Sequence, residues 1–397
     1  MTLGSEPTPA DHPALEALAR CVGAVDVFAD ELWGRHPVLR MAEDDRGFQD
    51  LLALDDVDHI VSSMGLRLPA FRLVKAGETL PSTRYTKTTR TGAQAATGVM
   101  DARAVFREFD AGATIVFQGM HRYWYPLARF CRHLEMSLGH PVQANAYVTP
   151  PGSQGLNAHE DEHDVFVLQS YGTKSWRIFE RHDLPPSRPP LIDAAVSPGD
   201  ALYIPEGFPH AASTQQQASV HLTIGILSIT WAAALRDAAK TAEREPSMQE
   251  PLPLRFARDK GGFQQLVQER LVEAGSLVAK ADAAQVAERI RRTFLTTRQP
   301  LLDGQISQLL SLDDLSDSST VRIRDTTMCV LGLERGELSV LLGDRELRMP
   351  AWLESAMSLI VERGRLQVAE LAPHLDGPGR LVLVRRLIVE GLLEVVE

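Results

Sequence analysis

The chain has 397 residues, too many for one ordinary hydrophobic core, so we expect two or three domains. Hydrophobic residues make up 44% and charged residues 23%, which is typical of a globular protein. The formal net charge of −11 argues against a general binder of nucleic acids or anionic membranes. The three cysteines, Cys21, Cys131 and Cys329, are far apart and form no CxxC pair. This argues against a disulfide framework or a zinc–thiolate site and favours a cytoplasmic protein.

The N-terminal part of the chain predicts helices and then a β-rich region. Residues 1–20 lack the basic start and apolar core of a secretion signal. Apolar residues at helical spacing predict a helix from Pro13 toward Arg40, where Pro37 stops the pattern. Many short apolar runs separated by Gly, Pro, Asp and Ser between Phe71 and Ile229 predict a β-sandwich or barrel. One helix, from Trp124 to Leu138, interrupts this region.

After Trp231 the strand signals stop and helical patterns follow. We expect helices at 232–244, 262–279 and 283–296. The tail combines strand-like pieces around 327–342 with helices at 351–361, 367–375 and 379–391, a combination that suggests a winged-helix module. We therefore predict an α+β multidomain protein with boundaries at 1–231, 232–300 and 301–397.

The segment Asn157 to Leu168 carries the most informative chemistry. In an extended chain residues i and i+2 point to the same face, so His159 and Asp161 can bind one metal together. A third ligand is supplied by the turn from Gly199 to His210, which has the pattern GDxxxIPxGxxH. His163 also lies in the run, and its spacing from His159 leaves it as an alternative ligand.

Two imidazoles and one carboxylate on one face of an octahedral ion leave positions open for other ligands. This arrangement suits non-haem iron(II), which must bind a cosubstrate and dioxygen (O2). Zinc prefers a closed tetrahedral set, and no thiolates are available in this region. An HxD motif alone occurs often by chance, whereas HxD followed by this turn in a β-rich region is a specific signal.

These motifs resemble the JmjC-type cupin oxygenases, especially the ribosomal-oxygenase branch. The resemblance includes a DVFVLQ strand at 164–169, a GTKSWR stretch at 172–177 and an N-terminal segment with Phe28, Trp33 and Pro37. It implies a double-stranded β-helix (jelly-roll cupin), a helical dimerisation region and a C-terminal winged helix. The apolar positions of the helices at 262–296 could equally pack within one chain, so the sequence leaves dimerisation open.

By this resemblance, His159, Asp161 and His210 match the Fe(II) ligands and the catalytic centre. Lys174 matches the basic residue that binds the distal carboxylate of 2-oxoglutarate, where a charge-assisted hydrogen bond is strong. Asn145 and Tyr147 stand on an inward-facing strand close to the cosubstrate or the substrate.

The resemblance further implies hydroxylation of an amino-acid side chain, with release of succinate and CO2. The expected substrate is the β-carbon of an arginine or histidine in a ribosomal or other protein. The acidic run Glu160, Asp161, Glu162 and Asp164 is either a solvated surface or a negative mouth for a basic side chain. The carboxylate of Asp161 favours hydroxylation over halogenation, which needs that ligand position vacant.

Other functions remain open from the sequence. The substrate could be a ribosomally made peptide or a free amino acid in a biosynthetic pathway. Histone demethylation fits less well, because we see no chromatin-reading module. The barrel could also be a non-catalytic binding module. Residues 351–397 hold five arginines and seven acidic residues, a net of −2, so we expect protein contact there and no direct nucleic-acid binding.

Overall fold

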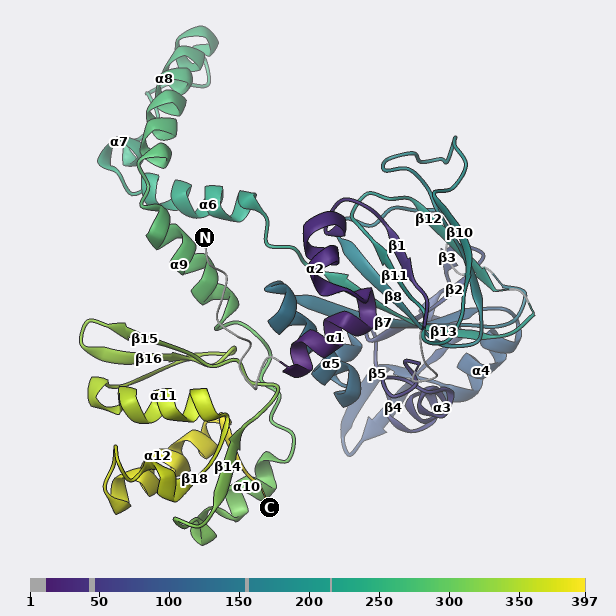
Figure 1. Ribbon diagram of the computed structural model, residues 1–397. Helices are drawn as coiled ribbons and strands as arrows, with labels where there is room; N and C mark the ends of the chain where they lie inside the picture. The colour runs from purple at the N-terminus through teal and green to yellow at the C-terminus, as the bar shows by residue number, and fades with distance from the viewer. Residues whose placement is uncertain (1–11, 43–46, 154–156, 215, 397) are drawn as a thin grey trace. The chain divides into compact units, whose positions relative to one another are not determined.

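The computed structural model describes residues 12–42, 47–153, 157–214 and 216–396 (Figure 1). Residues 1–11, on which the expected absence of a secretion signal largely rests, lie outside this range. No helix among the described residues is long and apolar enough to cross a membrane. The chain divides into two compact units, Met1–Ser228 with Leu301–Thr327 and Glu354–Glu397, and Ile229–Pro300 with Met328–Leu353.

The β-rich region of the first unit folds into two sheets whose neighbouring strands pair antiparallel. The larger sheet has eight strands in the order β1-β11-β8-β13-β7-β6-β2-β3, and the smaller one has the order β10-β9-β12. A hairpin of β4 (Thr86–Thr91) and β5 (Gln94–Met100) forms a separate sheet. The strands of the two main sheets are β1 (Val38–Arg40), β2 (Phe71–Lys75), β3 (Glu78–Thr79), β6 (Thr114–Phe117), β7 (Val142–Thr149), β8 (Asp164–Tyr171), β9 (Lys174–Ile178), β10 (Ile192–Val196), β11 (Ala201–Ile204), β12 (His210–Thr214) and β13 (Ser219–Ile226).

Helices pack against the outer face of the larger sheet. They are α1 (His12–Val22), α2 (Val25–Val27), α3 (Leu54–Ser63), α4 (Ala102–Asp110) and α5 (Tyr125–Leu138). The expected interruption at 124–138 is thus confirmed as α5. The helical pattern expected from Pro13, with its stop at Pro37, is confirmed in part: α1 is followed by α2 and by a π-helix at Phe28–Leu32, but the pattern is interrupted at Gly23. The main helix ends at Val22 before Gly23, which has a positive φ of 76°, and Val38–Arg40 pairs with β11 as an edge strand.

Residue alternation along the strands divides the larger sheet into two faces. The face toward the helices carries one large apolar cluster that includes Phe71, Leu73, Phe117 and Phe166. The opposite face packs against the smaller sheet through a second cluster that includes Val165, Val167, Trp176 and Ile178. Polar side chains interrupt this second layer, and they line the pocket described below.

The segments after the barrel contain both helices and small sheets. The helices expected after Trp231 are observed as α6 (Trp231–Ala242), α8 (Lys260–Ala279) and α9 (Ala283–Phe294), with a short α7 (Pro246–Gln249) between α6 and α8. The helix expected at 367–375 is wrong, because only a 3-10 turn at Val368–Leu371 forms there. The remaining elements are α10 (Gln305–Leu310), β14 (Thr320–Ile323), β15 (Val330–Glu334), β16 (Glu337–Leu341), β17 (Glu346–Pro350), α11 (Glu354–Arg363), β18 (Arg365–Gln367), α12 (Gly377–Val389) and β19 (Leu393–Val396).

Candidate active site

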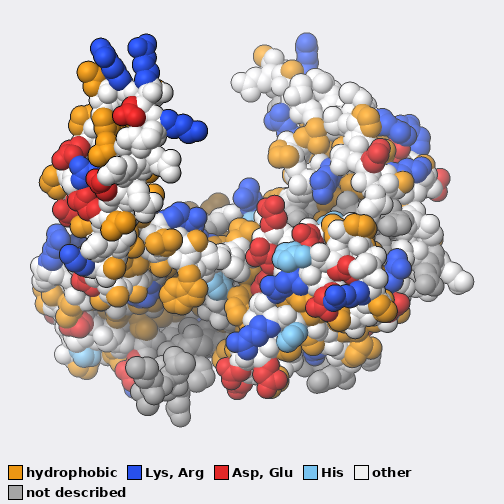
Figure 2. Space-filling view, turned by 90° about the horizontal axis from the view of Figure 1, so that it is seen from above, with side chains coloured by type: hydrophobic (Ala, Val, Ile, Leu, Met, Phe, Trp, Pro, Cys, Tyr) orange, Lys and Arg blue, Asp and Glu red, His pale blue; other side chains and the backbone are white. Residues whose placement is uncertain are grey.

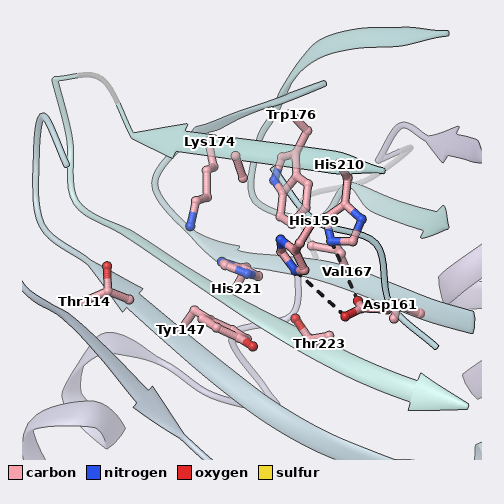
Figure 3. A pocket seen from close by; sticks show the side chains of 12 residues that line it. Thr114, Tyr147, His159, Asp161, Val167, Lys174, Trp176, His210, His221 and Thr223 are labelled. Atoms are coloured by element: carbon pink, nitrogen blue, oxygen red, sulfur yellow. Dashed lines mark ion pairs between the residues drawn. The ribbon is translucent and has the colours of Figure 1, made fainter. Parts of the chain in front are cut away.

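His159, Asp161 and His210 converge at one end of a pocket between the two sheets (Figure 3). One ligand atom from each of the three lies within 4.8 Å of the others. Nε2 of His159 is 3.8 Å from Oδ1 of Asp161, and Nε2 of His210 is 3.7 Å from Oδ2 of the same carboxylate. The structure therefore brings together the three residues that the HxD motif and the turn predict as metal ligands.

Backbone pairing holds the two histidines in place. His159 and His210 form an isolated antiparallel bridge, in which each backbone N–H donates to the other residue's carbonyl, at 3.2 and 2.8 Å. Nδ1 of His159 lies 2.9 Å from the Asn157 carbonyl, and Nδ1 of His210 lies 3.1 Å from the Phe208 carbonyl. A carbonyl oxygen only accepts, so each hydrogen bond requires a proton on Nδ1 and leaves Nε2 free to bind a metal.

Lys174, on β9, lies at the end of the same pocket that is away from His210 (Figure 3). Its side chain is buried, with 4% of its surface exposed, and its Nζ lies 3.2 Å from Oγ1 of Thr149. It forms no ion pair with a carboxylate of the described residues, and burial lowers its pKa to about 7. A buried cation without a counter-ion fits an anionic ligand that enters the pocket.

The wall between these two ends is aromatic. Tyr147 and His221 stack with ring centroids 4.9 Å apart, and Trp176 meets His221 edge-on at 5.4 Å. Burial, followed by the charges of Lys174 and His210, lowers the pKa of His221 well below its ordinary value, so the ring is neutral. Nδ1 of His221 and Nε1 of Trp176 are buried without a hydrogen-bond partner among the described residues. These two atoms leave hydrogen-bonding capacity for a polar ligand.

The other residues singled out from the sequence have different surroundings. Asn145 lies on β7 two residues from Tyr147, and its Oδ1 accepts a hydrogen bond from the Gly119 N–H at 2.9 Å. His163 is outside the cluster of possible metal ligands, and its ring lies against Gly225 of β13.

The acidic run does not form one continuous mouth. Glu160 and Glu162 are exposed, but Asp164 is 6% exposed and accepts hydrogen bonds from the Tyr203 hydroxyl and the Glu206 N–H. The hypothesis of a negative mouth is therefore wrong for Asp164, because its carboxylate has a structural role.

Several residues in and beside the pocket lie outside the sequence motifs. Thr114 and Thr223 line the pocket and Thr149 contacts Lys174, but none of the three lies in a motif, and strand pairing brings them to this face. Trp176 belongs to the GTKSWR stretch of the family resemblance, and its indole lines the pocket. The alternation of each strand predicts a two-faced pattern, whereas the choice of pocket-lining residues depends on pairing between distant segments.

The two halves of the pocket fit a metal and a dianionic cosubstrate. Two imidazoles and one carboxylate, with the opposite side open to the pocket, are a donor set suited to non-haem iron(II). A compound with two carboxylates fits between this centre and Lys174, since one carboxylate would bind the metal and the other the buried ammonium group.

Residues 120–234 match the JmjC domain family. Among curated proteins, the chain is similar to ribosomal oxygenase 2 of Mus musculus, with 31% identity over 223 residues, which cover 50% of this chain and 44% of that protein. It is 29% identical to ribosomal oxygenase 1 of Homo sapiens over 217 residues, which cover 50% of this chain and 32% of that protein. The chain thus spans less than half the length of these relatives.

Among solved structures, the chain is similar to YcfD, a ribosomal oxygenase from Escherichia coli, in complex with cobalt and succinic acid. The TM-score is 0.55 with 16% identity, and the similarity covers 95% of this chain and 99% of YcfD. A second structure of YcfD, with cobalt and 2-oxoglutarate, gives a TM-score of 0.54. At this identity the likeness establishes the fold, which is the cupin-type fold expected from the sequence.

Proposed function

Because residues 120–234 form a JmjC domain and the matched relatives are ribosomal oxygenases, we propose that this protein is an Fe(II)- and 2-oxoglutarate-dependent oxygenase. It hydroxylates an amino-acid side chain, and it consumes dioxygen and 2-oxoglutarate. The observation that carries the proposal is the pairing of the His159–Asp161–His210 cluster with the buried, unpaired Lys174 in one pocket.

Different residues of the pocket have different roles in this proposal. His159, Asp161 and His210 hold the metal, and Lys174 binds the distal carboxylate of 2-oxoglutarate with help from Thr149. The aromatic wall of Tyr147, Trp176 and His221 keeps water away from the cosubstrate. Bound iron(II), with 2-oxoglutarate and dioxygen, supplies the oxidation of a C–H bond to C–OH, with succinate and CO2 as products.

We propose a protein or peptide as the substrate, with the β-carbon of an arginine or histidine as the hydroxylated position. The names of the relatives support this substrate class, since they include ribosomal oxygenases and a "bifunctional lysine-specific demethylase and histidyl-hydroxylase" of Drosophila melanogaster. The exposed Glu160 and Glu162 beside the metal ligands favour a basic side chain.

We further propose that α6, α8 and α9 form a homodimer interface and that the C-terminal elements act as a winged-helix module. None of the residues of α8 is buried, although the helix carries Leu266, Val267, Leu271 and Val272. Hydrophobic side chains also gather at the surface on the left of Figure 2, where this part of the chain lies. A second copy of the chain is the occupant that would cover them.

The test measures succinate released from 2-oxoglutarate under air with added iron(II). Wild type is compared with His159→Ala and with a matched control, His163→Ala, which removes a neighbouring imidazole outside the cluster. We expect turnover in wild type and the control and none in His159→Ala. Incubation with cell-extract proteins, followed by intact-mass analysis, should reveal one added oxygen on a protein. Absence of succinate release from wild type with extract, peptides and free amino acids would favour a non-catalytic binding module.

A further inference from the structure

A second cationic side chain, Arg72, is partly buried and faces the same layer as the pocket. On β2, Phe71 and Leu73 are fully buried in the cluster on the helix side, so Arg72 between them points to the opposite face. The register pairs Arg72 with Val116, Val116 with Tyr147, and Tyr147 with His221. These four side chains form one row across β2, β6, β7 and β13, and the row ends in the aromatic wall of the pocket.

Arg72 reaches along this row to Tyr147, a residue of the pocket wall. It lies two strand spacings, roughly 10 Å, from Tyr147 and donates a hydrogen bond to the Tyr147 side chain. Its Nε is buried and has no hydrogen-bond partner among the described residues, and no carboxylate among them pairs with it. The guanidinium group therefore has unused donor capacity beside Tyr147.

The position of the Tyr147 hydroxyl places this capacity at the metal end of the pocket. In Figure 3 the hydroxyl points away from Lys174 and toward Thr223 and Asp161. The charge of Asp161 acts on Tyr147 together with that of Arg72, which agrees with this placement. Arg72 and Lys174 therefore serve different ends of the pocket.

The proposed cosubstrate does not account for Arg72. 2-Oxoglutarate has two carboxylates, of which one is matched by Lys174 and the other by the metal. A further cation with a free donor beside the metal end is then available to the substrate. A guanidinium group suits this role because its planar donors match a carboxylate or carbonyl group.

We infer, on the basis of the proposed function, that Arg72 determines substrate specificity by donating hydrogen bonds to a carbonyl or carboxylate oxygen of the substrate. The oxygen has two possible sources. It belongs either to the backbone of an internal peptide residue or to the free carboxylate of an amino acid. Arg72 also disfavours a substrate that presents a cationic group at this position, because like charges repel in a partly buried site.

The experiment measures probe binding in the full chain without turnover. The protein is loaded with Mn(II) and 2-oxoglutarate under argon, and broadening of probe proton NMR signals by Mn(II) reports binding at the metal. One probe set is a mixture of free amino acids. The other consists of the blocked peptides acetyl-Gly-His-Gly-amide and acetyl-Gly-Arg-Gly-amide. Binding of the free set alone identifies a carboxylate, and binding of the blocked peptides identifies a backbone carbonyl.

Two variants of Arg72 and a matched control decide the role of the side chain. Arg72→Met should weaken binding of the responding probe about 10- to 100-fold, as expected for loss of a hydrogen bond to a charged group. Arg72→Lys keeps the charge without the planar donors, so its affinity for the probe should lie between that of wild type and that of Arg72→Met. The control is Arg67→Met, an exposed arginine near the same sheet edge whose Nε donates to the Thr97 carbonyl, and it should match wild type. Affinity for 2-oxoglutarate should stay unchanged in all three, which also shows that the pocket is folded.

Three outcomes would overturn the inference while leaving the proposed function intact. They are equal probe binding by wild type and Arg72→Met, loss of 2-oxoglutarate binding in Arg72→Met, and binding of neither probe set by a wild type that binds Mn(II) and 2-oxoglutarate. Failure of wild type to bind Mn(II) and 2-oxoglutarate would overturn the proposed function and this inference together.

Discussion

The hydroxyl of Tyr203 donates a hydrogen bond to Oδ2 of Asp164 at 2.6 Å, and the backbone N–H of Gly34 donates to that hydroxyl at 2.8 Å. The second carboxylate oxygen of Asp164 accepts from the Glu206 N–H, also at 2.8 Å. Burial, followed by the charge of Asp164, raises the pKa of Tyr203, so the hydroxyl remains a donor at neutral pH. Asp164 thus ties the strand after the HxD motif to the turn that presents His210.

This connection predicts that Asp164→Ala weakens metal binding. The substitution leaves a buried hydroxyl and a backbone N–H without an acceptor and releases the turn before His210. We expect the affinity for Mn(II) to fall about 10- to 100-fold, the range found when partners that orient metal ligands are removed. Isothermal titration calorimetry measures the affinity. Tyr203→Phe, which keeps the bond to Glu206, should have a smaller effect. Unchanged affinity in a folded Asp164→Ala protein would contradict the positioning role.

Lys174 should make binding of 2-oxoglutarate depend on proton uptake. Because burial lowers the pKa of Lys174 to about 7, the free side chain is mostly neutral at pH 8 and mostly charged at pH 6. A bound carboxylate raises this pKa, so binding at pH 8 takes up close to one proton and binding at pH 6 much less. Calorimetry of the Mn(II)-loaded protein in buffers of different ionisation enthalpy measures this uptake.

A substitution provides the control for that measurement. Lys174→Met should abolish the proton uptake and weaken 2-oxoglutarate binding about 10- to 100-fold, because it removes a charge-assisted hydrogen bond. Metal affinity should stay near that of wild type, since Lys174 lies at the opposite end of the pocket from His210 (Figure 3). Equal proton uptake by both proteins would assign the titration to another group.

Gly225 allows the His163 ring to pack against β13. A Cβ at this position would lie 2.3 Å from Nε2 of His163, so Gly225→Ala forces the ring to move. We expect a loss of about 1–3 kcal/mol in the free energy of unfolding, the usual cost of overpacking. In the double variant with His163→Ala most of this loss should disappear. Urea denaturation of wild type, the two single variants and the double variant measures the coupling free energy between the two positions. Additive effects on the free energy of unfolding would mean that the two side chains do not meet.

The proposed dimer interface predicts that Leu271→Glu yields a monomer. Leu271 is 61% exposed on α8, so the substitution costs little within one chain, whereas it would place a carboxylate in an apolar interface. Light scattering during gel filtration measures the mass. Gln265→Glu, a polar position on the same helix, serves as the control. A monomeric wild type would show that α8 is covered by something other than a second copy.

The sequence alone was sufficient to identify the motifs that are close together along the chain. His159 and Asp161 are two residues apart, and His210 ends a turn defined by Gly and Pro, so local geometry already predicts their common orientation. The short apolar runs between Phe71 and Ile229 predict strands, and strands are observed throughout this region, because short β-branched runs bounded by turn residues are a strong local signal.

The tertiary structure decided what depends on pairing between distant segments. From the sequence, Asp164 is predicted to be one of several exposed acidic residues, but in the structure it is buried and accepts hydrogen bonds from Tyr203 and Glu206. Arg72 belongs to no motif, and only the register from β2 to β13 brings it to Tyr147 and His221. Side chains on a strand alternate between two faces, but which face becomes a pocket is fixed by the sheet packed against it.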